Sequence, residues 1–489
     1  MTSLFVSDTP VVRYTGGFDV ETPAGHATVT RVGSTGIDAI EPLLLVTSDG
    51  QTAVYARCPP HRAEDIAGRC LGAADQTAAD PDAVVDHDPR AVDLPVGILG
   101  THAAGTRRVL GGCGWRRPTE PTDHAEAGGF LDPPAATVLD AGERLHGRGW
   151  GDWCQDEPLA ETWRTVRDAG DAAVVVTARG PADSLLARSA PFELLDGATA
   201  LADAVGAETV VVYLDTEDER ALSRVRTAVR RYPDASVTVD VATGPSTYRA
   251  TEPTMALEAI EGTDRLEARL RPPGPDTVGL DGRPTAVHTA RTMAHLARAL
   301  RTDSPTDTRI VTVTGDVDAP ATVELPSDGT LATALDAVDA EGFKAACVGG
   351  RFGGLTPTLD IAPSPSALTP EGLGTEGVVH LLGEDRCLVE FVGKRTSFAA
   401  DANCGRCVPC REGTTQLAEL LRDVYDGGYD PAAIEELVGV MESTSICAFG
   451  VEAGRPARTA IEAFDAEFAA HADGDCPAGQ CFPPMETPT

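Results

Sequence analysis

The sequence predicts an α/β protein of several domains, and three stretches of the chain carry this prediction. Strand and helix patterns alternate over residues 170–231, which favours a parallel βαβ unit. Residues 309–382 contain two strand patterns, a short helix pattern and returning strands, as in a small β-grasp domain. Beyond residue 386, helical patterns flank a group of cysteines and indicate a C-terminal helical bundle.

The expected α/β core is an alternation of buried strands and helices. Residues 172–176 and 209–214 are apolar runs rich in Val, which are typical of strands buried on both faces. Residues 191–205 and 219–231 have helical patterns and follow these strands. Residues 285–300 also have helical periodicity, so a further helix is expected there.

The β-grasp unit and the bundle are predicted from shorter patterns. Residues 310–317 and 321–325 are expected to be strands, 331–338 a short helix, and a third strand is expected to end near Cys347. The bundle is expected to contain helices over 416–425, 431–442 and 455–470. An acidic, Pro-containing stretch at 80–93 predicts a linker.

The most specific chemical signal is a set of four cysteines. Cys404, Cys407 and Cys410 stand three residues apart, and Cys447 follows further along the chain. This spacing lets one compact turn direct three sulfurs to the same point, and four thiolates are what a [4Fe–4S] cluster requires. A structural zinc site with four cysteines is the alternative, although three ligands from one run exceed the usual share. The spacing therefore predicts a metal site for a [4Fe–4S] cluster and a role in electron transfer.

The remaining cysteines carry weaker signals. Cys476 and Cys481 cannot complete a cluster alone, so they either share a metal with a partner chain or form a free or disulfide-linked pair. Cys58, His61 and Cys70 are expected to be structural. Four isolated cysteines are expected to be inert packing, namely Cys113, Cys154, Cys347 and Cys387.

Composition and charge exclude two classes of protein. The formal net charge is −35, from 75 acidic and 40 basic residues, which would repel nucleic-acid phosphates. No apolar run approaches the roughly 20 residues of a membrane span, so direct membrane insertion is not expected. The lack of a targeting segment and the sparse cysteines predict a cytoplasmic protein.

Two motifs connect the chain with a known family. Residues 402–413 are similar to the family pattern Cys-Gly-x-Cys-x-Pro-Cys-Arg-x-Gly, and residues 445–450 match Thr-x-Cys-Ala-x-Gly except for a leading Ser. The glycine-rich runs at 349–354 and 372–377 resemble the same family upstream. The chain thus resembles the NADH-binding flavoprotein (51 kDa, F-type) subunit of respiratory complex I and of related soluble hydrogenases and formate dehydrogenases.

The resemblance implies a fold and a division of the chain. It implies a flavin-domain-like α/β core, an SLBB-like β-grasp domain and an iron–sulfur helical bundle. The predicted segments are 1–95, an α/β region with degenerate thioredoxin-like character; 96–305, a degenerate FMN- and NADH-binding domain; 306–385, the β-grasp domain; 386–475, the [4Fe–4S] bundle; and 476–489, a tail.

The resemblance also implies cofactors and the residues that would bind them. FMN would lie beside a glycine-rich loop at 147–153, whose open backbone can approach a phosphate closely. The implied cofactor-binding residues are Gly147, Arg148, Gly149, Glu252, Thr254 and Thr292. In this loop Trp150 and Asp152 replace small residues, adding bulk and negative charge, and Pro253 replaces an acid elsewhere in the pocket. These changes oppose binding of FMN and NADH.

The sequence is therefore consistent with three functions. The chain is an iron–sulfur electron relay inside a larger oxidoreductase, an active module that passes hydride from NADH to FMN and then electrons to the cluster, or a binding scaffold with a structural cluster. The resemblance implies redox partner subunits of the [2Fe–2S] or ferredoxin-like kind.

The acidic, lysine-poor composition resembles that of proteins from salt-loving archaea, and this predicts salt-dependent stability. Only Lys344 and Lys394 are lysines. We expect Tm to fall when salt is lowered from 1 M to 0.1 M, because the screening length grows from about 3 Å to about 10 Å and self-repulsion increases. Thermal unfolding at the two concentrations tests this, and an unchanged Tm contradicts a salt-adapted protein.

Overall fold

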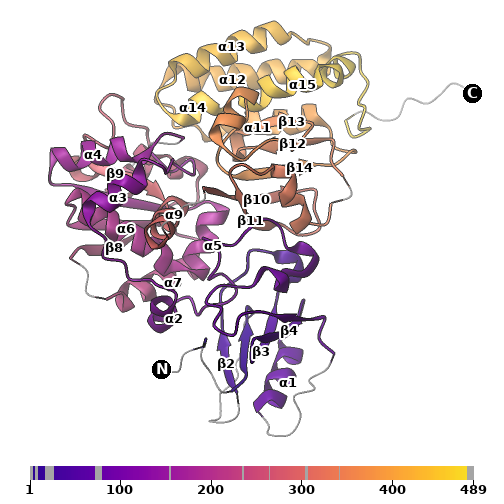
Figure 1. The fold of residues 1–489 in the computed structure, drawn as a ribbon. Helices are drawn as coiled ribbons and strands as arrows, with labels where there is room; N and C mark the ends of the chain where they lie inside the picture. Colours follow the sequence, from indigo (N-terminus) through magenta and orange to yellow (C-terminus); the bar gives the residue numbers. More distant parts are fainter. Residues whose placement is uncertain are drawn as a thin grey trace, which may run out of the picture.

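Figure 1 shows the chain as a computed structural model with three sheets and a helical bundle. Among the residues that the structure describes, no helix is both long and apolar enough to cross a membrane. Cys154 and residues 482–489 of the predicted tail lie outside the described residues. The structure describes residues 4–5, 9–16, 27–71, 80–153, 156–233, 236–263, 265–302, 307–340 and 342–481.

The N-terminal sheet has the strand order β2-β1-β3-β4-β5. β1 and β2 pair in parallel, and the other neighbours are antiparallel. Its strands are β1 (Val11–Tyr14), β2 (Thr28–Arg31), β3 (Leu44–Ser48), β4 (Gln51–Tyr55) and β5 (Ala83–Asp86). Helix α1 (Pro60–Leu71) packs on it through Ile66, in a cluster that also buries Tyr14 and Cys58. Cys58 thus packs structurally, as predicted, while a thioredoxin-like origin stays a prediction.

The central sheet is fully parallel, with the order β8-β7-β6-β9. Its strands are β6 (Ala173–Ala178), β7 (Thr209–Asp215), β8 (Thr238–Gly244) and β9 (Thr285–Thr289). Its helices are α2 (Pro121–Glu126), α3 (Ala135–Gly142), α4 (Leu159–Ala169), α5 (Pro181–Ser189), α6 (Pro191–Val205), α7 (Glu219–Arg231), α8 (Pro253–Ile260) and α9 (Ala290–Arg301). The βαβ prediction is confirmed, and α6 and α7 have the predicted bounds.

The third sheet has the order β11-β10-β14-β12-β13, with the parallel pair β10–β14 inside antiparallel neighbours. Its strands are β10 (Thr308–Gly315), β11 (Ala321–Pro326), β12 (Ala345–Val348), β13 (Gly354–Thr356) and β14 (Val378–Leu382). The predicted short helix is a 3₁₀ turn at Leu331–Ala337, and α10 (Pro365–Leu368) follows β13. This is the expected β-grasp arrangement; its SLBB-like identity stays a prediction.

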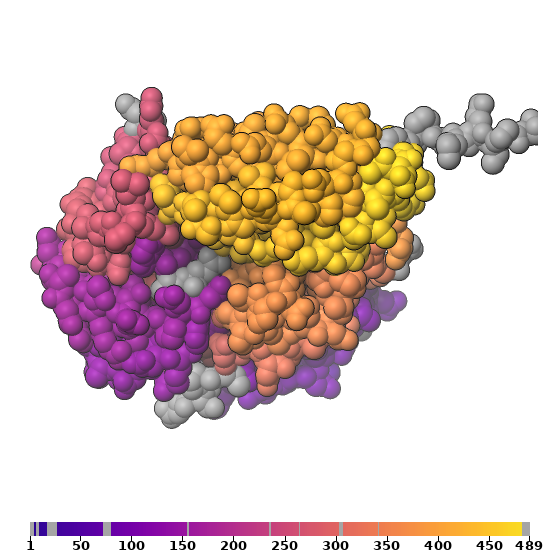
Figure 2. Space-filling view, turned by 90° about the horizontal axis from the view of Figure 1, so that it is seen from above, coloured from indigo at the N-terminus to yellow at the C-terminus, as the bar shows by residue number. Residues whose placement is uncertain are grey.

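The C-terminal bundle packs on this third sheet. It consists of α11 (Leu388–Ala402), α12 (Val408–Asp423), α13 (Pro431–Thr444), α14 (Ala448–Glu452) and α15 (Arg455–Ala472). Seen from above, the bundle covers the sheet and abuts the central domain at one end (Figure 2). There Met255 of α8 shares an apolar cluster with Phe449 of α14, so the bundle bridges two domains.

Three predictions are wrong in this structure. The first five residues of the predicted helix at 285–300 form β9, because the buried run ends in Thr289, which caps α9. The predicted linker at 80–93 contains the edge strand β5. Cys387 is not isolated, since its sulfur lies 3.2 Å from His471 Nε2 and 3.4 Å from Cys481 Sγ.

A buried ion network fixes α6 and α9 against the segment before α2. Arg301 pairs with Glu193 and Asp196, and Arg116 also binds Glu193 at 2.8 Å. Burial alone would raise the pKa of Glu193, but the guanidinium groups of Arg301 and Arg116 lower it to about 2. The network therefore stabilises the fold above the pKa of an unfolded glutamate, about 4.3, and this contribution is lost as pH falls towards 2.

We predict that Arg301→Ala destabilises the protein by about 3–5 kcal/mol, because it removes the positive charge that two buried carboxylates share, those of Glu193 and Asp196. Denaturant unfolding at neutral pH measures the loss. Arg226→Ala, on the exposed face of α7, is the matched control and is expected to change little. Equal destabilisation by the two variants would contradict a central role for the network.

Candidate metal centre and cofactor pocket

The four predicted cluster cysteines lie close together in one apolar cluster of the bundle. Cys404 and Cys407 precede α12, Cys410 lies in its first turn, and Cys447 directly precedes α14. Cys410 and Cys447 are buried, and the other two are half-buried. Burial raises the pKa of Cys410, and the three neighbouring thiols raise it further. Such a crowded set is stabilised in its thiolate form by a cationic metal centre, so the residues fit a cluster.

Backbone contacts shape the loop that carries the first two cysteines. Gly405 adopts a positive φ of 77°, and its N–H donates to Asn403 Oδ1 at 2.9 Å. Arg249 donates to the carbonyl oxygens of Ala402 and Asn403 at 3.0 and 2.8 Å. Arg411 donates to the carbonyl of Gly405 at 2.9 Å. Two arginines thus hold the loop in place without contacting the sulfurs.

The fourth cysteine is held by the start of α14. The backbone N–H groups of Gly450 and Phe449, in the first turn of α14, act to lower the pKa of Cys447, but other effects outweigh them. A side chain at Gly450 would lie 2.8 Å from Cys410 Cβ, so glycine permits the close approach of the two cysteine-bearing segments. Burial, and then the nearby Glu252, raise the pKa of Cys447 to about 12.

An aromatic cluster extends from the cysteines towards the central domain. Trp150 stacks on Tyr248, with ring centroids 4.2 Å apart and planes 13° apart. Phe352 contacts both Tyr248 and Phe449 edge to face. These rings belong to the same apolar cluster as Cys410. The bulky Trp150 side chain, which the sequence predicted to obstruct the flavin pocket, is therefore packed against Tyr248 beside the metal site. Tyr248 also lines a neighbouring cleft.

The cleft beside Tyr248 is open, has a volume of about 510 Å³ and lies between the central and third sheets. Arg179, Arg351 and Arg395 line it, together with Tyr248 and Glu376. Burial raises the pKa of Glu376 to about 7, although Arg291 opposes the shift. Asp215 also lines the cleft and pairs with Arg179, so the positive charge that faces the cleft comes from Arg351 and Arg395.

The glycine-rich loop at 147–153 already holds an anion, the carboxylate of Asp152. This side chain is buried and accepts six hydrogen bonds from the loop, the end of β9 and the first turn of α9. The donors are the N–H groups of Arg148 (2.8 Å), Gly149 (2.8 Å) and Thr289 (3.0 Å), the hydroxyls of Thr289 (3.1 Å) and Thr292 (3.0 Å), and His288 Nδ1 (3.1 Å).

The protonation of His288 follows from its second partner. Trp163 Nε1–H donates to His288 Nε2 at 2.8 Å, so Nδ1 carries the proton that reaches Asp152. Burial alone would raise the pKa of Asp152, but the hydrogen bond from His288, with those from the backbone N–H groups of Thr289 and Arg148, lowers it. Asp152 is thus held ionised in a cage of donors.

This cage decides how the loop fits a flavin phosphate. The same N–H groups that a phosphate would need are used by Asp152, and a phosphate placed beside that carboxylate would be repelled. The loop as it stands therefore does not fit the phosphate of FMN. The sequence indicated a repulsive charge; the structure places that charge at the centre of the donors.

The predicted residues of the loop are also engaged elsewhere. The carbonyl of Gly147 accepts from Arg309 at 2.9 Å. The Arg148 guanidinium donates to the carbonyl of Thr308 at 2.6 Å and pairs with Asp307. Gly149 and Thr292 both donate to Asp152. These residues join the loop to α9 and to the start of β10.

Glu252 and Thr254 have a structural environment at the start of α8. Glu252 caps the helix, accepting from the N–H groups of Thr254 at 2.9 Å and Met255 at 3.0 Å, and it pairs with Arg271. Pro253 occupies the first turn, where its missing N–H costs nothing. The Thr254 hydroxyl donates to Glu252 at 2.6 Å. Both predicted residues are buried, and they stabilise the first turn of α8.

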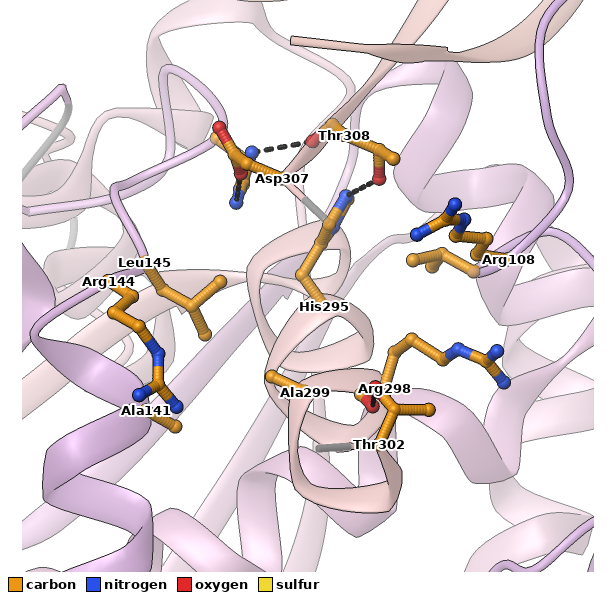
Figure 3. Close-up of a pocket in the computed structure, with 12 residues that line it drawn as sticks. Arg108, Ala141, Arg144, Leu145, His295, Arg298, Ala299, Thr302, Asp307 and Thr308 are labelled. Carbon is orange, nitrogen blue, oxygen red and sulfur yellow. Dashed lines mark hydrogen bonds and ion pairs between the residues drawn. The ribbon is translucent and has the colours of Figure 1, made fainter. Parts of the chain in front are cut away.

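A second pocket lies behind the loop, beside α9 (Figure 3). His295 Nε2 lies 3.2 Å from Thr308 Oγ1 within it, and Arg148 and Asp307 close one side. Its volume is about 70 Å³. That is too small for a nucleotide, since ligand pockets typically measure about 300–1,000 Å³.

Comparisons with known proteins agree with this geometry. Residues 160–298 match the Nuo51 FMN-binding domain, and residues 390–471 match the NADH-ubiquinone oxidoreductase-F iron–sulfur binding region. The chain therefore contains segments similar to two regions of the F subunit of NADH-ubiquinone oxidoreductase. It is 28% identical to the second F subunit of NADH-quinone oxidoreductase from Rhizobium meliloti over 324 residues, which cover 59% of this chain and 76% of that protein.

A hydrogenase subunit is similar to a longer stretch of this chain. The alpha subunit of the NAD-reducing hydrogenase HoxS of Cupriavidus necator is 25% identical over 464 residues, covering 88% of this chain and 74% of that protein. The crystal structure of an NAD⁺-reducing [NiFe]-hydrogenase in the H₂-reduced state has a similar fold. Its TM-score is 0.62 at 24% identity, with 91% of this chain and 77% of that chain covered.

We predict that the wild-type chain binds FMN weakly and that Trp150→Gly/Asp152→Gly binds it at least about tenfold more tightly, a gain of about 1.4 kcal/mol. The double variant removes the stacked Trp150 ring and frees the donors of the cage for a phosphate. Quenching of flavin fluorescence measures both affinities.

The control for this prediction is Asp168→Gly, which removes an exposed carboxylate and is expected to change nothing. Submicromolar binding of FMN by the wild type would contradict the closed cradle.

Proposed function

We propose that the chain is an electron-transfer subunit of the F type, which relays electrons through one [4Fe–4S] cluster held by Cys404, Cys407, Cys410 and Cys447. The observation that carries this proposal is the convergence of these four thiols at one end of an apolar cluster of aromatic rings. When bound, such a cluster takes up and releases one electron at a time.

The protein's own residues would tune this site in two ways. The N–H groups of Phe449 and Gly450 stabilise negative charge on Cys447, which favours the thiolate form. Trp150 and Phe352 are bulky and apolar, so they keep water away from the buried side of the site. Arg249 and Arg411 fix the loop on the exposed side.

The electron donor or acceptor is expected to be another protein. The relatives are named as subunits of larger enzymes, which supports redox partner subunits for this chain. We propose a [2Fe–2S] or ferredoxin-like partner in the cytoplasm. The half-buried Cys404 and Cys407 place one side of the cluster close to the surface, where such a partner can approach.

An active NADH:FMN module is the second candidate, and the arginine-lined cleft is the observation in its favour. Arg351 and Arg395 supply positive charge beside Tyr248, as an anionic dinucleotide would require. The closed cradle argues against FMN in this cleft. A purified chain that reduces ferricyanide with NADH and carries flavin absorbance would favour the module over the simple relay.

We predict about four iron and four sulfide per chain after anaerobic preparation. Cys404→Ser is expected to remove the broad visible absorbance and lower the Tm, because cluster binding stabilises the folded bundle. Cys347→Ser, which removes a buried thiol outside the set, is expected to retain the cluster. Elemental analysis and absorbance test both variants, and zinc without iron at this site would refute the cluster.

A further inference from the structure

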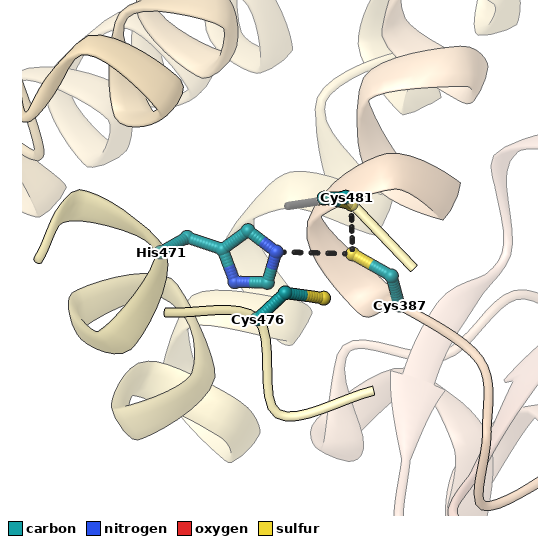
Figure 4. Close-up of side chains that lie close together, drawn as sticks. All are labelled: Cys387, His471, Cys476 and Cys481. Carbon is teal, nitrogen blue, oxygen red and sulfur yellow. Dashed lines mark hydrogen bonds between the residues drawn. The ribbon is translucent and has the colours of Figure 1, made fainter. Parts of the chain in front are cut away.

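A second group of metal-binding side chains lies at the opposite end of α11 from the cluster cysteines. Cys387, His471, Cys476 and Cys481 each offer one ligand atom, and these four atoms all lie within 4.8 Å of one another. Figure 4 shows the sulfurs and the imidazole directed into one small space. We propose that this Cys₃His group binds one zinc ion that fastens residues 476–481 to the bundle.

The distances fit a single ion. Cys387 Sγ lies 3.2 Å from His471 Nε2 and 3.4 Å from Cys481 Sγ. Tetrahedral zinc, with Zn–S of about 2.3 Å and Zn–N of about 2.0 Å, places its ligand atoms about 3.4–3.8 Å apart. A four-iron cube is larger than one ion and does not fit between atoms at this separation. The gap of four residues between Cys476 and Cys481 also lies within the range used by zinc sites.

The histidine is oriented as a metal ligand. Its Nδ1 lies 2.9 Å from the carbonyl oxygen of Glu467, so Nδ1 carries the proton and donates it. The unprotonated Nε2 then faces the three sulfurs, which is the tautomer that metal-bound histidines adopt through such contacts. His471 is fully buried, so this orientation is fixed by packing.

One of the cysteines has a backbone donor that would stabilise its thiolate. Cys387 caps α11 and accepts from the N–H of Glu390 at 3.2 Å. The three sulfurs and one imidazole therefore need no further ligand to form a closed, four-coordinate site.

Contacts around this group hold its two supporting helices together. Glu467 of α15 accepts from the N–H of Leu388 at 2.8 Å and from Lys344 Nζ at 3.1 Å. These contacts fix the start of α11, and thus Cys387, against the helix that carries His471. Tyr425 Oη lies 3.8 Å from Cys481 Sγ and covers the outer side. These contacts therefore fix the positions of Cys387 and His471, against which residues 476–481 pack.

A disulfide does not account for the arrangement as well. The sulfurs of Cys387 and Cys481 are 3.4 Å apart, against about 2.05 Å in a disulfide. A disulfide between these two cysteines would also not explain why the buried Nε2 of His471 and the thiol of Cys476 lie within 4.8 Å of both sulfurs. This zinc site does not rest on the proposed electron relay, because it shares none of its residues.

The test is metal analysis of the full chain, with one variant from each site. We expect about one zinc per chain in addition to the iron. His471→Ala and Cys481→Ser are expected to lose the zinc and keep the iron and the visible absorbance. Cys404→Ser is expected to lose the iron and keep the zinc. Cys70→Ser, which removes a half-buried thiol in α1, is expected to keep both.

Three results would overturn the proposal. They are a wild type without zinc, a Cys387–Cys481 or Cys476–Cys481 disulfide found by mass spectrometry, and extra iron that disappears in Cys481→Ser. A measurement on the wild type covers the case in which the variants fail to fold. Alkylation of Cys476 and Cys481 is expected to be slow until a zinc chelator is added, and rapid alkylation without the chelator would equally overturn the site.

Discussion

The Asp152 carboxylate is the contact on which the centre of this molecule depends. Its six donors come from the glycine-rich loop, from the end of β9 and from the first turn of α9. The N–H groups of Gly149 and Thr289 and His288 Nδ1 would lose this partner without it, and a buried hydrogen bond left unmade costs about 1–3 kcal/mol. An aspartate in the loop thus supplies internally the negative charge that such a cradle of N–H groups requires.

Because this anion belongs to the chain, the stability of the domain does not depend on a bound ligand. A cradle that depends on a bound phosphate is complete only when the ligand is present, whereas this one is complete in the chain alone. Trp150 strengthens the closure by stacking on Tyr248. The arginine-lined cleft beyond these rings remains open, so the chain retains a space for an anion while its phosphate cradle is filled.

The sequence predicted local structure well where periodicity and capping agree. The bounds of α6 and α7 follow from strong helical patterns, and the cluster cysteines follow from their spacing. β9 was misassigned because five buried residues before a helix continue its apolar period. The sequence predicted the negative charge of Asp152 but not all the donors around it. Three of the donor residues, His288, Thr289 and Thr292, stand more than 130 residues further along the chain, and only the fold brings them together with Asp152.

The second thiol group could not be found from sequence because its ligands are dispersed. Cys476 and Cys481 form a visible pair, but Cys387 and His471 carry no spacing signal that joins them. The structure brings them together because the start of α11, after Cys387, packs on the end of α15, which carries His471. Helix α11 ends just before the loop of Cys404. Its 15 residues span about 22 Å at 1.5 Å per residue. A zinc ion at the first end would hold the start of this helix while the cluster holds the loop that follows its other end. The bundle would then be fixed at both ends by metal–thiolate bonds, so that a protein docking at either end meets a rigid surface.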